Sequence, residues 1–75
     1  MSPDDLRRIS AIRMAAASGE ARDKRRELRL TLKEVAAAVG ASPSSLHRWE
    51  HGQTTPRGAL AVRWAKVLGI KTKVS

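Results

Sequence analysis

The chain has 75 residues, enough for one small domain with a single core but too few for two lobes around a catalytic cleft. Fifteen Lys and Arg against seven Asp and Glu give a net charge of +8, which favours a polyanionic partner, nucleic acid first, over an acidic protein or an anionic membrane. The absence of cysteine excludes a disulfide framework and a thiolate zinc site, and the charged N-terminus excludes a secretion signal, so we expect a soluble, cytoplasmic protein.

Helix starts are marked by hydroxyl residues. All three prolines follow one, in the pairs Ser2-Pro3, Ser42-Pro43 and Thr55-Pro56. A hydroxyl at the N-cap accepts a hydrogen bond from the first turn, and proline suits the first helical position because its φ is preset. Thr31 and Glu34 have the spacing of a capping box. Gly40 and Gly69 follow apolar runs, where a left-handed residue ends a helix.

These signals predict an all-α fold, a compact bundle of four to five helices. The expected helices span residues 3–17, 19–28, 32–39, 43–51 and 56–68. In the first, Leu6, Ile9, Ile12 and Ala16 are expected on the buried side. Ser18-Gly19 leaves open whether residues 3–28 form one kinked helix or two, and the only strand-like alternation lies in residues 70–74.

The helices at 32–39 and 43–51 are separated by three residues, Gly40-Ala41-Ser42. A turn this short, with a glycine, is typical of a helix-turn-helix. Two helices joined so tightly need a small residue where their backbones approach, and Ala36 supplies it. The apolar residues expected to fill the angle between them are Val35, Val39, Leu46 and Trp49.

The second of these helices has one polar face. Ser44, His47, Arg48 and His51 recur at the spacing of one helical stripe. Leu46 and Trp49 fall roughly opposite, so we expect the tryptophan to face the core and the basic residues to face solvent, as in a helix that enters the DNA major groove.

The stretches LTLKEVAAAVGASPSSLHRWEHGQTTP and LAVRWAKVLGI resemble the Xre-type, or lambda-repressor-like, helix-turn-helix family. The resemblance covers about residues 21–70 and implies a helical bundle that binds operator DNA, usually as a dimer. It suggests a helix-turn-helix domain at 19–70, preceded by a helical extension at 1–18 and followed by a tail at 71–75.

The resemblance also assigns roles to individual residues. The base-contacting positions of the family fall on Pro43, Ser44, His47 and Arg48. Arg48 is the strongest candidate, because a guanidinium bound to guanine O6 and N7 contributes about 1–3 kcal/mol of discrimination. Pro43 offers only apolar contact. His51 falls where the recognition helix meets the DNA backbone.

Further residues are expected near phosphates, which fix the position of the protein without carrying sequence information. They are Lys33, Gln53, Thr54 and Arg57. Arg25 and Glu50 match a pair that forms an inward salt bridge in several family members. An exposed carboxylate on the helix surface is the alternative for Glu50.

The chain departs from the family pattern at several positions. Leu32 replaces a glutamine that touches phosphate, so that contact is expected to be lost. Arg29 replaces the glycine usual before Leu30, which leaves the helix exit in doubt. The family usually has a further helix after the position of Ile70, and in this chain the short tail at 71–75 takes its place. The N-terminal segment is expected either to cover the core surface that this exposes or to form a dimer contact.

Two chemical alternatives carry less weight. Residues 47–51 match the zinc-protease pattern H-x-x-E-H, but a third ligand is missing and the chain is short, so we expect neither a metal nor another cofactor. Trp49 and Trp64 could stack on unpaired bases, but their positions beside leucines favour core packing.

The expected function is a non-enzymatic, sequence-specific regulator of transcription, a repressor first of all. Its expected partner is a palindromic operator in double-stranded DNA, bound as a homodimer in a bacterial nucleoid or a phage-infected host. Three alternatives remain: an antitoxin with a protein partner for residues 1–18, an excisionase-like factor, or a protein-interaction module that uses the basic face. Membrane binding is disfavoured by Asp4 and Asp5.

Overall fold

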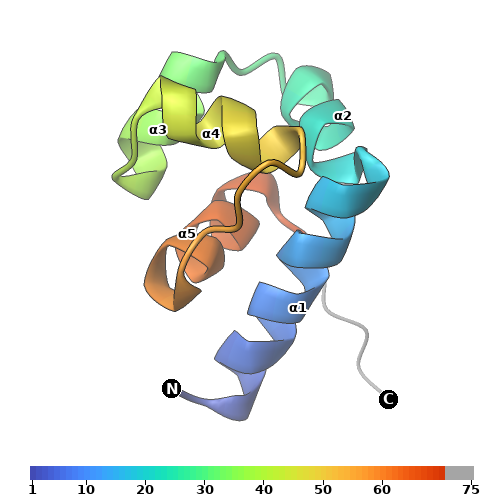
Figure 1. Ribbon diagram of the computed structural model, residues 1–75, viewed down its shortest axis with the longest axis vertical. Coiled ribbons are helices and arrows are strands. Elements are labelled where there is room, and N and C mark those ends of the chain that lie inside the picture. The colour runs from blue at the N-terminus through green and yellow to red at the C-terminus, as the bar shows by residue number, and fades with distance from the viewer. Residues whose placement is uncertain (71–75) are drawn as a thin grey trace.

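The computed structural model describes residues 1–70, all of whose regular structure is α-helical (Figure 1). The helices are α1 (Pro3–Ser18), α2 (Glu20–Glu27), α3 (Leu32–Val39), α4 (Pro43–Glu50) and α5 (Gly58–Leu68). The predicted all-α class is therefore confirmed. The expected tail at 71–75 and most of the strand-like alternation lie outside the described residues. None of the helices described is both long and apolar enough to cross a membrane.

The region 3–28 forms two helices that meet at one glycine. Ser2 caps α1, since its hydroxyl accepts a hydrogen bond of 3.1 Å from the Asp5 N–H. Gly19 ends α1 and precedes α2, with a φ of 85° that only glycine adopts at little cost. The region therefore forms two separate helices rather than one kinked helix.

The predicted start of α5 is wrong. Thr55 and Pro56 were expected as N-cap and first helical residue, but the helix begins at Gly58 and Arg57 is its N-cap. Pro56 is instead buried in the preceding loop, while Thr55 is exposed. The φ of proline suits an extended loop as well as a helix start, so burial of the ring determines where the helix begins.

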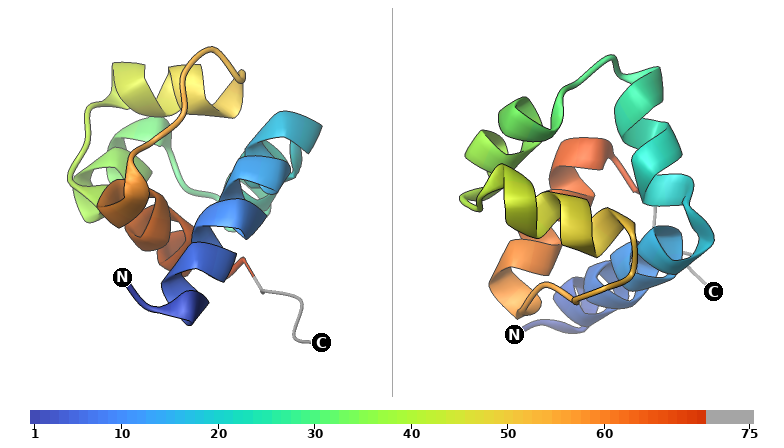
Figure 2. Two further views of the ribbon diagram at one scale, coloured as in Figure 1. Left: turned by 60° about the horizontal axis from the view of Figure 1, so that its bottom comes forward. Right: turned by 45° about the horizontal axis from the view of Figure 1, so that its top comes forward.

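One hydrophobic core joins the helices. Its largest fully buried side chains are Trp64, Ile12, Leu46, Leu68, Val35 and Val39. Helix α1 lies along α5 and contributes Ile9, Ile12 and Ala15 to this core, so residues 1–18 are packed into the same body as the helix-turn-helix (Figures 1 and 2).

The expected buried side of α1 is partly wrong. Leu6 is 58% exposed, whereas Ile9 and Ile12 are buried and Ala16 is partly buried. A helix turns by about 100° per residue, so Leu6, six residues before Ile12, lies about 120° around the helix from it. The face that packs on α5 is centred on Ile12 and excludes Leu6.

The predicted capping box at the start of α3 is present. The Thr31 N–H donates to the Glu34 carboxylate at 2.9 Å, and the Glu34 N–H donates to Thr31 Oγ1 at 3.0 Å. The hydrogen bond from the Thr31 backbone lowers the pKa of Glu34 below its usual 4.5, and the hydrogen bond with the Thr31 side chain lowers this pKa by a smaller amount.

Because of this capping box, the stability of the fold varies with pH in the acidic range. Because the pKa of Glu34 is lower in the folded state, its stabilising effect is present above pH 4.5 and is lost as the pH falls below that value. Thermal unfolding of the Glu34→Gln variant should give a lower midpoint than the wild type near neutral pH, and the two midpoints should converge in acid. A difference that stays constant across the pH series would contradict this role of the charge.

Candidate nucleic-acid interface

Helices α3 and α4 are joined by a tight turn. Gly40 has a φ of 87°, and the N–H groups of Gly40 and Ala41 both donate to the Ala36 carbonyl at 2.9 Å. Ser42 caps α4 by accepting a hydrogen bond of 3.1 Å from the Ser45 N–H. Ala36 is 1% exposed, so its small side chain lies inside the crossing. This is the helix-turn-helix geometry that the spacing predicts.

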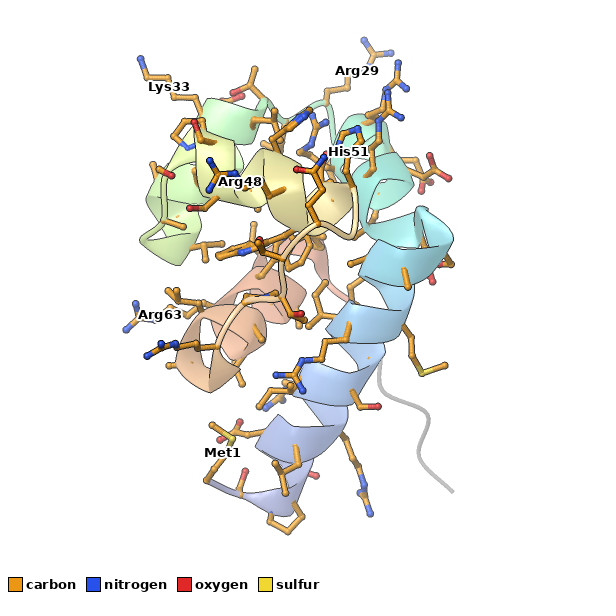
Figure 3. The ribbon with its side chains drawn as sticks, viewed as in Figure 1. Met1, Arg29, Lys33, Arg48, His51 and Arg63 are labelled. Atoms are coloured by element: carbon orange, nitrogen blue, oxygen red, sulfur yellow. The ribbon has the colours of Figure 1, made fainter. Side chains whose placement is uncertain are left out.

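Helix α4 has one buried and one exposed face. Leu46 and Trp49 are buried, and Trp49 packs on Trp64 with ring centroids 5.4 Å apart. Both indoles therefore belong to the core rather than to a base-stacking surface. On the opposite face Ser44, His47 and Arg48 are exposed, together with the C-cap residue His51. Figure 3 shows Arg48 and His51 on this face.

The buried face of α4 also carries a charged group. Glu50 accepts two hydrogen bonds from Arg25, at 2.6 Å from Nε to Oε2 and at 3.1 Å from Nη2 to Oε1. Its side chain is only 1% exposed, and that of Arg25 is 14% exposed. Glu50 therefore forms the inward pair and is not an exposed carboxylate, so the exposed face of α4 carries no negative charge from it.

An open groove runs over the exposed face of α4. It is lined by Leu32, Pro43, Ser44, His47, Arg48 and Gln53. The groove brings together the four residues expected to contact bases. Leu32 was expected only as a lost contact, yet it forms an apolar part of the wall. The sequence position of Leu32 at the start of α3 could have indicated this role in the groove, because α3 and α4 cross so that Leu32 lies beside the start of α4.

The residues expected near phosphates lie in the first turn of α3 and in the segment between α4 and α5. Lys33 projects from the first turn of α3 away from the body of the protein (Figure 3). Gln53 and Thr54 are exposed in the loop after α4, and Arg57 is exposed at the N-cap of α5. No side chain caps α5, so its first-turn N–H groups are not satisfied in that way.

The cations of this face are not neutralised by the protein itself. Among residues 1–70 the ion pairs join Arg7 to Asp4, Arg8 to Asp5 and Arg25 to Glu50. Lys33, Arg48 and Arg57 are absent from these pairs. Their charges are thus available to an anionic partner.

The two histidines of α4 lie against each other. The rings of His47 and His51 have centroids 4.1 Å apart, and His51 Nδ1 lies 2.8 Å from the His47 carbonyl oxygen. Glu50, the acid of the H-x-x-E-H pattern, points inward to Arg25. Within the described part of the chain, no three His, Cys, Asp or Glu residues form a group that could hold a metal ion.

One comparison with known proteins agrees with this geometry. A family model described as helix-turn-helix matches residues 22–74, which include α3, the turn and α4. No curated protein and no solved structure matches the chain.

Proposed function

Because the chain belongs to the helix-turn-helix family of the Xre, or lambda-repressor-like, type, we propose that it is a sequence-specific transcriptional regulator, a repressor, that binds double-stranded DNA through α4. One observation carries the proposal: α4 exposes Ser44, His47 and Arg48 while Leu46 and Trp49 fix its other side in the core. A helix held from behind presents its polar side chains from fixed backbone positions, as contact with successive bases in the major groove requires.

In this proposal α4 supplies the choice of sequence. The guanidinium of Arg48 binds O6 and N7 of a guanine, and Ser44 and His47 contribute single hydrogen bonds to neighbouring base edges. Pro43 and Leu32, which line the same groove, provide apolar surface suited to a thymine methyl group. No step of this function is catalytic.

Phosphate contacts fix the position of α4 on the duplex. Lys33 binds one strand from the start of α3. Gln53, Thr54 and Arg57 bind the other strand, together with the N–H groups of the first turn of α5, which no side chain caps, and His51 approaches the backbone from the end of α4.

The protein binds its operator as a homodimer. A single eight-residue recognition helix contacts few base pairs, and two copies related by a two-fold axis double the sequence that is recognised. The corresponding operator is a palindrome with half-sites about 34 Å, or one turn of DNA, apart. Selection of binding sites from random duplexes followed by sequencing would return such a palindrome.

The simplest test is the salt dependence of binding to duplex DNA. Lys33 and Arg57 should each release about 0.9 counterion, so log K plotted against log salt should have a slope of about −2 or steeper per protomer. The measurement is a fluorescence anisotropy titration of a labelled random duplex at several salt concentrations. Failure to bind at low salt would contradict DNA binding and favour an acidic protein partner for the basic face.

A further inference from the structure

The turn between α2 and α3 contains an unusual backbone conformation. Arg29 has a φ of 57° and is the only residue other than glycine with a positive φ in residues 1–70. The left-handed region is unfavourable for an L-residue with a Cβ atom, and arginine has no local interaction that compensates, as the side chains of Asn and Asp have.

The turn itself calls for glycine. The Arg29 N–H donates to the Arg26 carbonyl at 3.0 Å, and the Leu30 N–H donates to the Arg25 carbonyl at 3.1 Å. These two bonds form a Schellman motif, in which the left-handed position is usually glycine. Glycine would close the same turn with less strain, so the turn gives no reason for an arginine. Strain of this kind is retained where the side chain has a function.

The position of Arg29 relative to α4 is fixed by hydrogen bonds. Arg25 Nη1 donates to the carbonyl of Leu30 at 2.9 Å, while the rest of the same guanidinium binds Glu50 on α4. The residue after Arg29 is therefore tied to the recognition helix through one side chain. The backbone from which Arg29 projects is thereby held in place relative to α4.

The side chain of Arg29 is exposed and points away from the protein. Figure 3 shows it projecting from the same end of the molecule as Lys33. Among the residues described, no carboxylate lies within ion-pair distance of its guanidinium. Its charge is thus available at the edge of the surface that is proposed to bind DNA.

We propose that Arg29 binds a backbone phosphate of the duplex beside α4, on the same side as Lys33, and that this contact is the reason for its strained conformation. The inference rests on the proposed function and extends it by one positioning residue. A guanidinium can bind phosphate with two parallel hydrogen bonds, and the fixed turn limits the entropy lost on binding. The contact adds affinity for any sequence and does not select bases.

The test compares Arg29→Gly with Arg29→Lys and with Arg7→Ala. Arg29→Gly should raise the midpoint of thermal unfolding. Per protomer, it should also weaken binding to operator and random duplexes equally, by about eightfold near 0.1 M salt, and reduce the salt slope by about 0.9. Arg29→Lys should keep the slope without the gain in stability. Arg7→Ala removes the same charge from the N-terminal half of α1, at the end of the molecule away from α3, and should leave the slope unchanged (Figure 1).

Each outcome decides the question. An Arg29→Gly variant that is more stable but keeps the wild-type slope overturns the phosphate contact while leaving the proposed function intact. A variant without a gain in stability shows that the arginine serves the C-terminal end of α2, where the helix dipole favours cations, and overturns the argument from strain. A wild-type protein that does not bind duplex DNA at low salt overturns both the inference and the proposed function.

Discussion

Replacement of Arg25 by methionine is expected to lower the free energy of unfolding by about 3–5 kcal/mol, because it leaves the carboxylate of Glu50 buried without a partner. The Glu50 side chain is 1% exposed, and Arg25 supplies both of its ion-pair hydrogen bonds. A domain of this size has a total stability on the order of 4–11 kcal/mol, so the loss is a large part of it. Urea unfolding followed by the fluorescence of the buried Trp49 and Trp64 measures the change.

The matched control removes both members of the pair. The double variant Arg25→Met with Glu50→Met contains no unpaired charge, and it should recover most of the stability that the single variant loses. Arg22→Met, an exposed arginine of the same helix, should change the free energy of unfolding little. A single Arg25→Met variant as stable as the wild type would show that Glu50 is solvated rather than buried.

Substitution of Arg48 by alanine is expected to reduce the preference for operator over random duplex by roughly 5- to 150-fold per half-site, which corresponds to about 1–3 kcal/mol. The side chain is exposed and no residue among those described pairs with it, so the midpoint of thermal unfolding should stay the same. The measurement is the ratio of the two dissociation constants at one salt concentration.

Arg57→Ala is the control for this loss of specificity. Arg57 is exposed at the N-cap of α5, outside the groove over α4, so its removal should weaken binding to both duplexes about equally and reduce the salt slope by about 0.9 per protomer. If Arg48→Ala left the ratio of the two affinities unchanged, the role of Arg48 in base recognition would be wrong. The choice of sequence would then have to come from His47 and Ser44.

Local signals were sufficient for most of the fold. Ser2, Thr31 and Ser42 cap helices where expected, and Gly19, Gly40 and Gly69 end them in the left-handed conformation. A cap joins residues two or three positions apart, and the polar stripe of α4 follows from helical periodicity alone. Both can therefore be identified without knowledge of the tertiary structure.

The same signals failed where packing competes with them. Thr55-Pro56 has the pattern of a helix start, yet Pro56 is buried and α5 begins two residues later. Leu6 fits a helical stripe together with Ile9, but the face of α1 that packs on α5 excludes it. In each case the local pattern allowed more than one arrangement, and burial selected one of them.

The sequence by itself determined that the fold is helical, that the two helices joined by Gly40-Ala41-Ser42 form a helix-turn-helix, and which side chains of α4 are polar. The tertiary structure decided that Glu50 points inward to Arg25, 25 positions away in the chain, and that Arg29 adopts a left-handed conformation in a turn tied to α4. The physical reason is the range of the interactions. Caps and periodicity act within one or two turns, whereas the desolvation and pairing of a charge depend on which helices meet in space.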